Sequence, residues 1–260
     1  MQSHFLGVRA DLVTRSAALE SVRRRLVSDQ RSSPSRIYFT NVHSIILARK
    51  SPSFARAIET ADLVLPDGSG LRLAGQILSQ PVMENLNGTD FIPLVLGEAE
   101  KGRWSVYLLG GRPEVVEASS ERLKARFPSL NVVGYRSGYF KPEDEAAVIS
   151  DINSKRPDIL LVALGSPLQE MFLQKWCDRL KVKACFAVGG LFDFLSGNKK
   201  RAPAWMRSMG IEWAFRLVLD PKNKWKRTVI EIPLFLTMIL TQRLFPQYSQ
   251  RNPQSEHEAL

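Results

Sequence analysis

Cysteine and histidine are scarce in this sequence of 260 residues, which contains two cysteines and three histidines. Two cysteines cannot build the disulfide framework of a small secreted protein, and a chain of this length buries enough apolar surface to fold without one. A reducing compartment is therefore expected. His4, His43 and His257 have no metal-ligand spacing, and the sequence has no D-x-D carboxylate pair. A metal site is not indicated.

Long hydrophobic runs are also missing. The N-terminus has no continuous apolar segment behind a basic start, so no signal peptide is expected. The apolar stretch 229–240 is about a dozen residues long and contains Glu231 and Pro233. A membrane-spanning helix needs roughly 20 apolar residues, so this stretch is not expected to span. We expect the protein to stay in the cytoplasm.

Positive charge is concentrated in one segment. The chain has a net charge of +10, and residues 199–243 hold ten Lys and Arg against three acids, a net of +7. The other 215 residues carry only +3. Nucleic acid, anionic lipid and a diphosphate ligand are all partners that such a segment could bind.

Short apolar runs alternate with helix-like segments from residue 36 to residue 190. Several runs have no polar alternation, as expected of strands buried on both faces of a parallel sheet. The predicted strands are 36–40, 62–65, 105–109, 131–135, 159–164 and 184–188. The predicted helices are 43–60, 69–80, 89–101, 113–127, 143–155 and 167–181. This order predicts an α/β fold with a mostly parallel sheet, and the N-terminal segment 5–27 is expected to join the edge of that sheet.

The pattern changes after Gly197. Residues 199–243 show helical patterns only, rich in basic residues and tryptophan. Trp205, Trp213 and Trp225 suit a helix at a membrane interface, although Trp213 could equally pack onto the core. We therefore divide the chain into an α/β core (1–196), a basic amphipathic helical appendage (197–246) and a polar tail (247–260) that is expected to be disordered.

The residues that follow the predicted strands are the candidates for a site, because ligands of α/β sheets bind beyond the carboxyl ends of the strands. These residues are Asn41, Asp67-Gly68, Gly110-Gly111, the turn SGYF (137–140), GSPLQE (165–170) and GGLFDF (189–194). Each segment alone is a weak signal. Together they predict a ligand site on one rim of the sheet.

Three of these segments allow two interpretations each. Gly110 and Gly111 could cradle a phosphate with backbone amides, or make a tight strand-to-helix turn. Gln169 and Glu170 could face a ligand, or be first-turn residues that stabilise the helix dipole. Asp67 could be the N-cap of the following helix, or a carboxylate placed to take a proton from a hydroxyl. Spacing alone leaves the first two open and favours the cap for Asp67.

Six segments carry a more specific signal. They are ADLVLPDG (61–68), LLGGRPEVV (108–116), SGYF (137–140), GSPLQE (165–170), GGLFDFLSGNKKRAPAWM (189–206) and GIEWAFRLVLDP (210–221). In their order and spacing they resemble the WecG/TagA/CpsF glycosyltransferases, glycosyltransferase family 26. The resemblance covers roughly residues 5–245, and its block from Gly189 to Pro221 is highly specific.

The resemblance implies a Rossmann-like, inverting transferase that moves a sugar from a UDP-sugar to a saccharide linked to undecaprenyl diphosphate. Such enzymes act in cell-surface polysaccharide or exopolysaccharide biosynthesis. The donor would be of the glucose or N-acetylmannosamine type, with no metal and no other cofactor. The C-terminal appendage would dock on an anionic membrane surface at the inner face of the cytoplasmic membrane, so nucleic acid is not expected as a partner.

The same resemblance assigns roles to residues. Asp67 matches the family's proposed catalytic base, which reverses the preference for a cap, and Asn41 matches a second catalytic position. The positions that match the UDP-sugar pocket are Gly110, Gly111, Tyr139, Gln169, Glu170, Gly189, Gly190 and Asp193. The basic residues expected to meet the acceptor diphosphate or the membrane are Arg201, Arg207, Arg216, Lys224, Lys226 and Arg227.

The sequence departs from the family pattern at three places. Phe39 occupies a position where the family usually has threonine, and Thr40 comes one residue late, on the opposite face of a strand. Asn85 replaces the arginine of the motif E-R-x-x-G-x-D. An asparagine offers no charged fork for a carboxylate or phosphate, which favours a neutral donor such as UDP-glucose. Asn223 replaces an arginine of the appendage, where neighbouring lysines partly restore the charge.

Two other functions compete with this interpretation. A nucleotide-binding dehydrogenase needs a GxGxxG turn and an acidic residue about twenty positions further on, and neither is present. A non-catalytic module that binds a nucleotide sugar or a membrane would explain the charged segment. It would not explain why the polar residues that follow several strands are expected on the same rim of the sheet.

Overall fold

A six-stranded parallel sheet is the centre of the computed structural model, which describes residues 2–28, 33–82 and 84–245. The strand order is β4-β3-β8-β7-β5-β6. The strands are β3 (Ser35–Thr40), β4 (Leu63–Pro66), β5 (Val106–Gly110), β6 (Val132–Arg136), β7 (Ile159–Ala163) and β8 (Ala184–Ala187). The predicted α/β fold is confirmed, and each predicted strand is present with slightly shifted ends.

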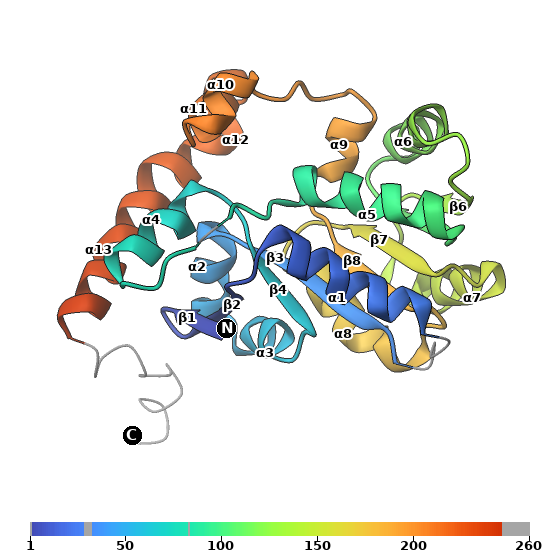
Figure 1. Ribbon diagram of the computed structural model, residues 1–260, viewed down its shortest axis with the longest axis horizontal. Coiled ribbons are helices and arrows are strands. Elements are labelled where there is room, and N and C mark those ends of the chain that lie inside the picture. The colour runs from blue at the N-terminus through green and yellow to red at the C-terminus, as the bar shows by residue number, and fades with distance from the viewer. Residues whose placement is uncertain (1, 29–32, 83, 246–260) are drawn as a thin grey trace.

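Helices cover both faces of the sheet (Figure 1). One face packs against α2 (Val42–Lys50), α3 (Pro52–Glu59), α4 (Ser69–Ile77), α7 (Glu145–Lys155) and α8 (Leu168–Trp176). The other packs against α1 (Arg15–Val27), α5 (Gly88–Gly102), α6 (Pro113–Arg126) and α9 (Leu191–Leu195). Strand β7 shows why: Leu160 and Val162 join one apolar cluster, and Leu161 joins the other. A strand that is apolar on both sides needs cover on both sides.

The single helix predicted over 43–60 is wrong, because the chain forms two helices, α2 and α3. They meet at Ser51, which has extended backbone angles (φ −136°, ψ 99°) and precedes Pro52. The proline ring disfavours helical angles in the residue before it. Ser51 Oγ then accepts the N–H of Phe54 at 3.4 Å, so the interrupting residue caps the second helix.

The N-terminal segment does not join the sheet as predicted. Strands β1 (Gln2–Phe5) and β2 (Val8–Asp11) pair only with each other, as an antiparallel hairpin. The hairpin is attached to the edge strand β4 by a side chain, since Asp11 Oδ2 accepts the N–H of Val64 at 2.8 Å. Arg9 holds that carboxylate with two hydrogen bonds and donates a third to Ala61 O at 2.8 Å. A buried ion pair thus takes the place of a backbone ladder.

The described part of the C-terminal appendage contains helices and no strand, as predicted, with residues 197–203 leading into the first helix. It contains α10 (Ala204–Ser208), α11 (Glu212–Leu219), α12 (Pro221–Trp225), a π-helical segment (Lys226–Glu231) and α13 (Ile232–Leu244). Figure 1 shows α10 to α12 gathered at one end of the molecule and α13 running beside α4. The tail predicted at 247–260 lies outside the described residues.

Helix α13 is packed into the core. Phe235 and Ile239 are fully buried and belong to the apolar cluster that covers one face of the sheet. Gln242 Oε1 accepts the N–H of Leu6, in the turn of the N-terminal hairpin, at 2.9 Å. The last helix therefore closes against the first element of the chain.

Exposed apolar side chains are concentrated in the appendage. Those in the described part of it include Trp205, Met209, Trp213, Val218, Leu219, Trp225, Val229, Ile230, Leu240 and Leu244. Trp213 is exposed rather than packed on the core. In the described part of the chain, no helix is both long and apolar enough to cross a membrane.

Replacing Phe235 tests how firmly α13 is held. Phe235→Ala should lower the free energy of unfolding by about 3 kcal/mol, because it removes a fully buried ring and leaves a cavity. Leu234→Ala, on the same helix but 46% exposed, should lower it by less than about 1 kcal/mol. Urea unfolding followed by circular dichroism measures both. Equal losses for the two variants would mean that α13 is not part of the folded core.

Candidate active site

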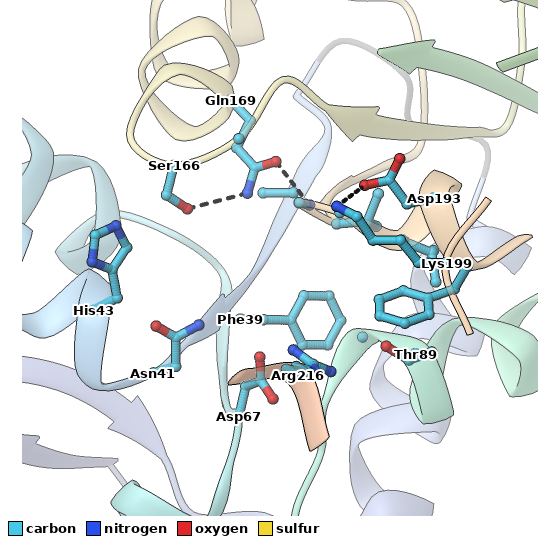
Figure 2. Close-up of a pocket in the computed structure, with 18 of the residues that line it drawn as sticks. Phe39, Asn41, His43, Asp67, Thr89, Ser166, Gln169, Asp193, Lys199 and Arg216 are labelled. Carbon is cyan, nitrogen blue, oxygen red and sulfur yellow. Dashed lines mark hydrogen bonds and ion pairs between the residues drawn. The ribbon is translucent and has the colours of Figure 1, made fainter. Parts of the chain in front are cut away.

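A pocket of about 690 Å³ opens at the carboxyl ends of β3, β4, β7 and β8, on the rim predicted from the sequence (Figure 2). The side chains that line it from the core include Phe39, Asn41, His43, Asp67, Thr89, Ser166, Gln169, Asp193 and Phe194. The appendage closes another part of the wall with Lys199, Lys200, Arg216, Leu219 and Asp220. Segments from both ends of the chain therefore build one cavity.

Asp67 lines this pocket and is not the cap of a helix. Its N–H donates to Thr40 O at 2.7 Å, which ties the end of β4 to the end of β3. The N-cap of α4 is the next residue, Gly68, at φ +96°, and α4 has no side-chain cap hydrogen bond. The N–H of Gly68 donates instead to Asn85 Oδ1 at 2.8 Å. The cap favoured by spacing is wrong, and the carboxylate lies on the pocket wall.

Asn41 and His43 lie on the pocket wall at the start of α2. Asn41 is the N-cap of that helix: its Oδ1 accepts the N–H of Ser44 at 3.1 Å, and Ser44 Oγ accepts the N–H of Asn41 at 2.7 Å. This capping box fixes the asparagine on a rigid element. His43 Nδ1 lies 2.9 Å from Glu231 Oε2, a residue of the appendage.

The structure of β3 shows which of Phe39 and Thr40 reaches the pocket. Phe39 lines the pocket, whereas Thr40 is buried and shares a 3.3 Å hydrogen bond with Ser44 Oγ. Thr40 therefore does not take over the threonine position of the family. An aromatic ring stands at that part of the wall instead, and it packs edge-on against Phe91 behind it.

A buried glutamate organises the loops after β7 and β8. Gln169 Oε1 accepts the N–H of Gly189 at 2.9 Å, and Gln169 Nε2 donates to Glu170 Oε1 at 2.8 Å. Ser166 Oγ donates to the same glutamate oxygen at 2.7 Å. Gln169, Gly189 and Ser166 line the pocket, while Glu170 is buried behind them and is not among the lining residues. Glu170 thus holds the wall in place.

Burial raises the pKa of Glu170 above the ordinary glutamate value, although hydrogen bonds from Gln169 and Ser166 act in the opposite direction. Its Oε2 atom has no hydrogen-bond partner among the described residues. A proton on that oxygen would remove the cost of burying a charge.

Three cations among the described residues line the pocket, and carboxylates hold two of them. Lys199 Nζ lies 2.6 Å from Asp193 Oδ2. Arg216 donates to Glu212 Oε1 at 2.6 and 3.2 Å, and its guanidinium lies 5.4 Å from the centre of the Phe194 ring. Lys200 is the third. These cations all lie on the part of the pocket wall that the appendage forms.

Other cations of the predicted set lie elsewhere. Arg201 forms a double ion pair with Asp90, at 2.5 and 2.7 Å, and Arg207 lies 3.6 Å from the same carboxylate. Burial alone would raise the pKa of Asp90, but the hydrogen bonds from Arg201 and Asn87 outweigh it and lower that pKa. Neither arginine is among the residues that line the pocket. Arg201 fastens the start of the appendage to α5.

The remaining predicted cations, Lys224, Lys226 and Arg227, lie in α12 and in the π-helical segment after it. Lys226 is exposed, with its ammonium group 5.9 Å from the centre of the Trp225 ring. The side chains of Lys224 and Arg227 lie outside the described residues. Of the described cations in the predicted set, only Arg216 lies on the pocket wall.

Gly110 and Gly111 form a tight turn after β5 and are not among the pocket-lining residues. A Cβ on Gly110 would stand 2.4 Å from Ala163 O of the neighbouring strand, and both glycines have positive φ. The turn therefore demands glycine whether or not a ligand is present. Tyr139, after β6, is 76% exposed and also outside the lining. Gly190 and Asp193, in contrast, do line the pocket.

Several residues that line the pocket are absent from the predicted site residues. Lys199 and Lys200 stand directly after the glycine-rich segment that follows β8, and Thr89 belongs to the motif that contains Asn85. Their place in family-like motifs was a usable signal. Among the described residues, no group of three or more His, Cys, Asp or Glu side chains could hold a metal ion.

Known proteins similar to this chain are glycosyltransferases. The family model described as "Glycosyl transferase WecG/TagA/CpsF family" matches residues 3–249. A protein of Bacillus spizizenii is 32% identical over 214 residues, which are 81% of this chain and 82% of that protein. One of Bacillus subtilis is 29% identical over 210 residues, 81% and 80% of the two chains. Both are named N-acetylglucosaminyldiphosphoundecaprenol N-acetyl-beta-D-mannosaminyltransferase.

The raised pKa of Glu170 predicts a pH dependence of stability. Below the ordinary glutamate pKa of 4.5, Glu170 is protonated in both the folded and the unfolded chain. As the pH rises above that value the unfolded chain ionises first, so the free energy of unfolding falls until the folded pKa is passed. Glu170→Gln cannot ionise and should not show this fall.

Urea unfolding of both proteins between pH 4.5 and 7.5 measures the difference. The stability of Glu170→Gln relative to the wild type should increase with pH. Glu143→Gln, which removes a carboxylate that is 69% exposed, is the matched control. Parallel curves for Glu170→Gln and the wild type would contradict the assignment.

Proposed function

The chain belongs to the WecG/TagA/CpsF family of glycosyltransferases, and we propose that it transfers a sugar from a UDP-sugar to a saccharide linked to undecaprenyl diphosphate. The names of the two Bacillus proteins support an acceptor of this kind. The observation that carries the proposal is the pocket itself, where a carboxylate lies in the same cavity as three cations. A transferase of this type needs a base for the acceptor and positive charge for the departing diphosphate.

Asp67 is the proposed catalytic base. It would take the proton of the acceptor hydroxyl, whose oxygen then attacks the anomeric carbon from the face opposite UDP and inverts that centre. Its position supports this role, because the carboxylate lines the pocket and the main chain around it is held at both Asp67 and Gly68. Asn41 is rigidly placed on the same wall, where it is proposed to orient the sugar.

Lys199, Lys200 and Arg216 are proposed to stabilise the departing diphosphate. Fixed positive charge aimed at a developing negative charge lowers the barrier, most strongly where water is excluded. The carboxylates of Asp193 and Glu212 hold two of these cations near the cavity. This arrangement is proposed to replace a bound metal, in keeping with the missing D-x-D motif.

The donor is proposed to carry N-acetylmannosamine. The preference for UDP-glucose was based on the missing charge at Asn85, but Asn85 is bound to the backbone of Gly68 and is not among the residues that line the pocket. The missing charge at Asn85 is therefore no reason to prefer UDP-glucose. The names of both Bacillus relatives favour the mannosaminyl group over a glucosyl group.

The appendage is proposed to rest on the inner face of the cytoplasmic membrane. Its exposed tryptophans and aliphatic side chains would enter the interface, while its basic residues would contribute about 1 kcal/mol each towards anionic lipid. Arg216 and Leu219 belong both to this segment and to the pocket wall. The site would thus open close to a lipid-linked acceptor. A module that binds a nucleotide sugar without turning it over is the competing hypothesis.

A panel of UDP-sugars, each offered with an undecaprenyl-diphosphate-linked N-acetylglucosamine, tests the function, with the product detected by mass spectrometry. We expect transfer of N-acetylmannosamine, and we expect it to continue in EDTA. No transfer from any donor, despite tight UDP binding, would favour the non-catalytic module.

Asp67→Asn separates catalysis from binding in the same assay. Turnover should fall roughly a hundredfold or more, because an amide cannot accept the hydroxyl proton. The affinity for UDP, measured by calorimetry, should change little. Turnover within a few-fold of the wild type would remove Asp67 from the role of base.

Vesicle binding tests the appendage. Vesicles that contain phosphatidylglycerol should bind the protein more tightly than pure phosphatidylcholine, and salt should weaken that preference. The double variant Trp205→Ser and Met209→Ser should bind less, because both side chains are exposed, Trp205 on α10 and Met209 directly after it. The matched control is Val27→Ser and Leu94→Ser, which replaces exposed side chains on α1 and α5 of the core. Point variants are preferable to truncation, because removal of α13 would uncover the core. Equal binding by both double variants would contradict the assignment.

A further inference from the structure

We propose that Asn85 is a positioning residue for Asp67: it holds the turn that carries the catalytic carboxylate, from a segment that lies outside the pocket. The inference rests on the proposed function, in which Asp67 is the base. It concerns a residue that does not touch the substrate and that acts through the backbone of Gly68.

The turn that carries Asp67 is fixed by hydrogen bonds on consecutive residues. The N–H of Asp67 donates to Thr40 O at 2.7 Å, so one side of the turn is bound to β3. The N–H of Gly68 donates to Asn85 Oδ1 at 2.8 Å, so the other side is bound to the segment before α5. The N–H of Leu86 donates back to Pro66 O at 3.0 Å. Three hydrogen bonds thus hold the main chain at Pro66, Asp67 and Gly68, and with it the position of the carboxylate.

The start of α4 explains why an outside acceptor is needed. The first N–H groups of a helix, including that of the N-cap residue, have no partner within the helix. In a capping box the side chain of the third helical residue binds the N-cap N–H, but in α4 that residue is Leu71, which has no acceptor. Asn85 accepts the N–H of the N-cap residue Gly68 instead, from seventeen positions further along the chain.

Asn85 is itself firmly held. Leu86, beside it, is 1% exposed and belongs to the apolar cluster on the α5 side of the sheet. Asn87 caps α5, with Oδ1 accepting the N–H of Asp90 at 2.9 Å. On the other side, the carboxylate of Glu84 accepts the N–H of Arg15 at 2.9 Å. A segment fixed on both sides can impose its geometry on the turn.

The chemical type of residue 85 also matters. The amide oxygen accepts a hydrogen bond without adding charge beside Asp67. An arginine has no acceptor and could not make this contact. A carboxylate could accept the bond, but its negative charge would disfavour the ionised form of Asp67 and raise the pKa of the base. A neutral acceptor therefore holds the turn without placing a second charge next to it.

Two variants of Asn85 separate these effects. Asn85→Ala removes the acceptor and should lower kcat roughly tenfold or more, with little change in KM for the UDP-sugar, since small displacements of a reacting group cost large factors in rate. Asn85→Asp restores the acceptor. It should recover most of kcat at high pH, while the acidic limb of its pH–rate profile moves to higher pH because its base is harder to ionise.

Two controls show whether the effect passes through Asp67. Ser51→Ala removes the N-cap of α3, which does not line the pocket, and should lower stability without moving kcat. In the Asp67→Asn background, Asn85→Ala should cost nothing further in single-turnover rate, because the group that it positions is already absent.

The outcomes are decisive for either proposal. Wild-type kcat and pH profile in both Asn85 variants, with Asp67→Asn inactive, would overturn the positioning role and leave the base intact. Full additivity of Asn85→Ala with Asp67→Asn would also overturn it. Near-normal turnover by Asp67→Asn would remove the base, and the positioning role with it. Failure of every UDP-sugar to react with the wild type would instead refute the proposed function.

Discussion

Burial of the parallel sheet on both faces decides where this protein can place polar chemistry. Strands such as β7 are apolar on both sides and covered by helices on both sides, so neither face offers a hydrated surface. Polar side chains are left to the ends of the strands. The exits of β3, β4, β7 and β8 lie together because those four strands are neighbours in the sheet. The pocket follows from that order of strands.

The appendage completes the pocket because it is anchored at several places. Arg201 fastens its beginning to Asp90, and Phe235 and Ile239 bury its last helix in the core. Between these anchors, α11 brings Arg216 to the open side of the cavity. The basic segment that the sequence predicts as a membrane-docking helical appendage is therefore a wall of the site as well as an exposed apolar and cationic surface.

The sequence predicted the sheet and the rim well, because apolar runs and the residues after them are local features. It failed where the answer depended on distant neighbours. Position 110 requires glycine because a Cβ there would collide with the backbone of Ala163. That contact exists only because β5 and β7 are neighbours in the sheet. The helix after Asp67 begins at Gly68, whose N–H is bound by Asn85, seventeen positions further on.

The same limit applies to charge. Spacing could not show that Arg201 pairs with Asp90, 111 positions earlier, whereas the appendage sequence alone identified it as one more cation for an anionic ligand. The hairpin was misplaced for a related reason. Its apolar residues suggested an edge strand, but the buried pair of Arg9 and Asp11 attaches it through a side chain. Ion pairs formed across the fold leave little trace in local patterns.

The contact between Gln242 and Leu6 has a consequence for biosynthesis. It joins positions 236 residues apart, and the pairing of His43 with Glu231 spans 188. During translation the strands of the sheet leave the ribosome well before the appendage does. Until then the pocket is incomplete, and the apolar surface beside α4 that α13 covers is exposed. We expect the pocket to be complete only after the appendage has emerged and docked. Such long-range closure is the slow kind of folding step, and it makes activity a property of the finished chain.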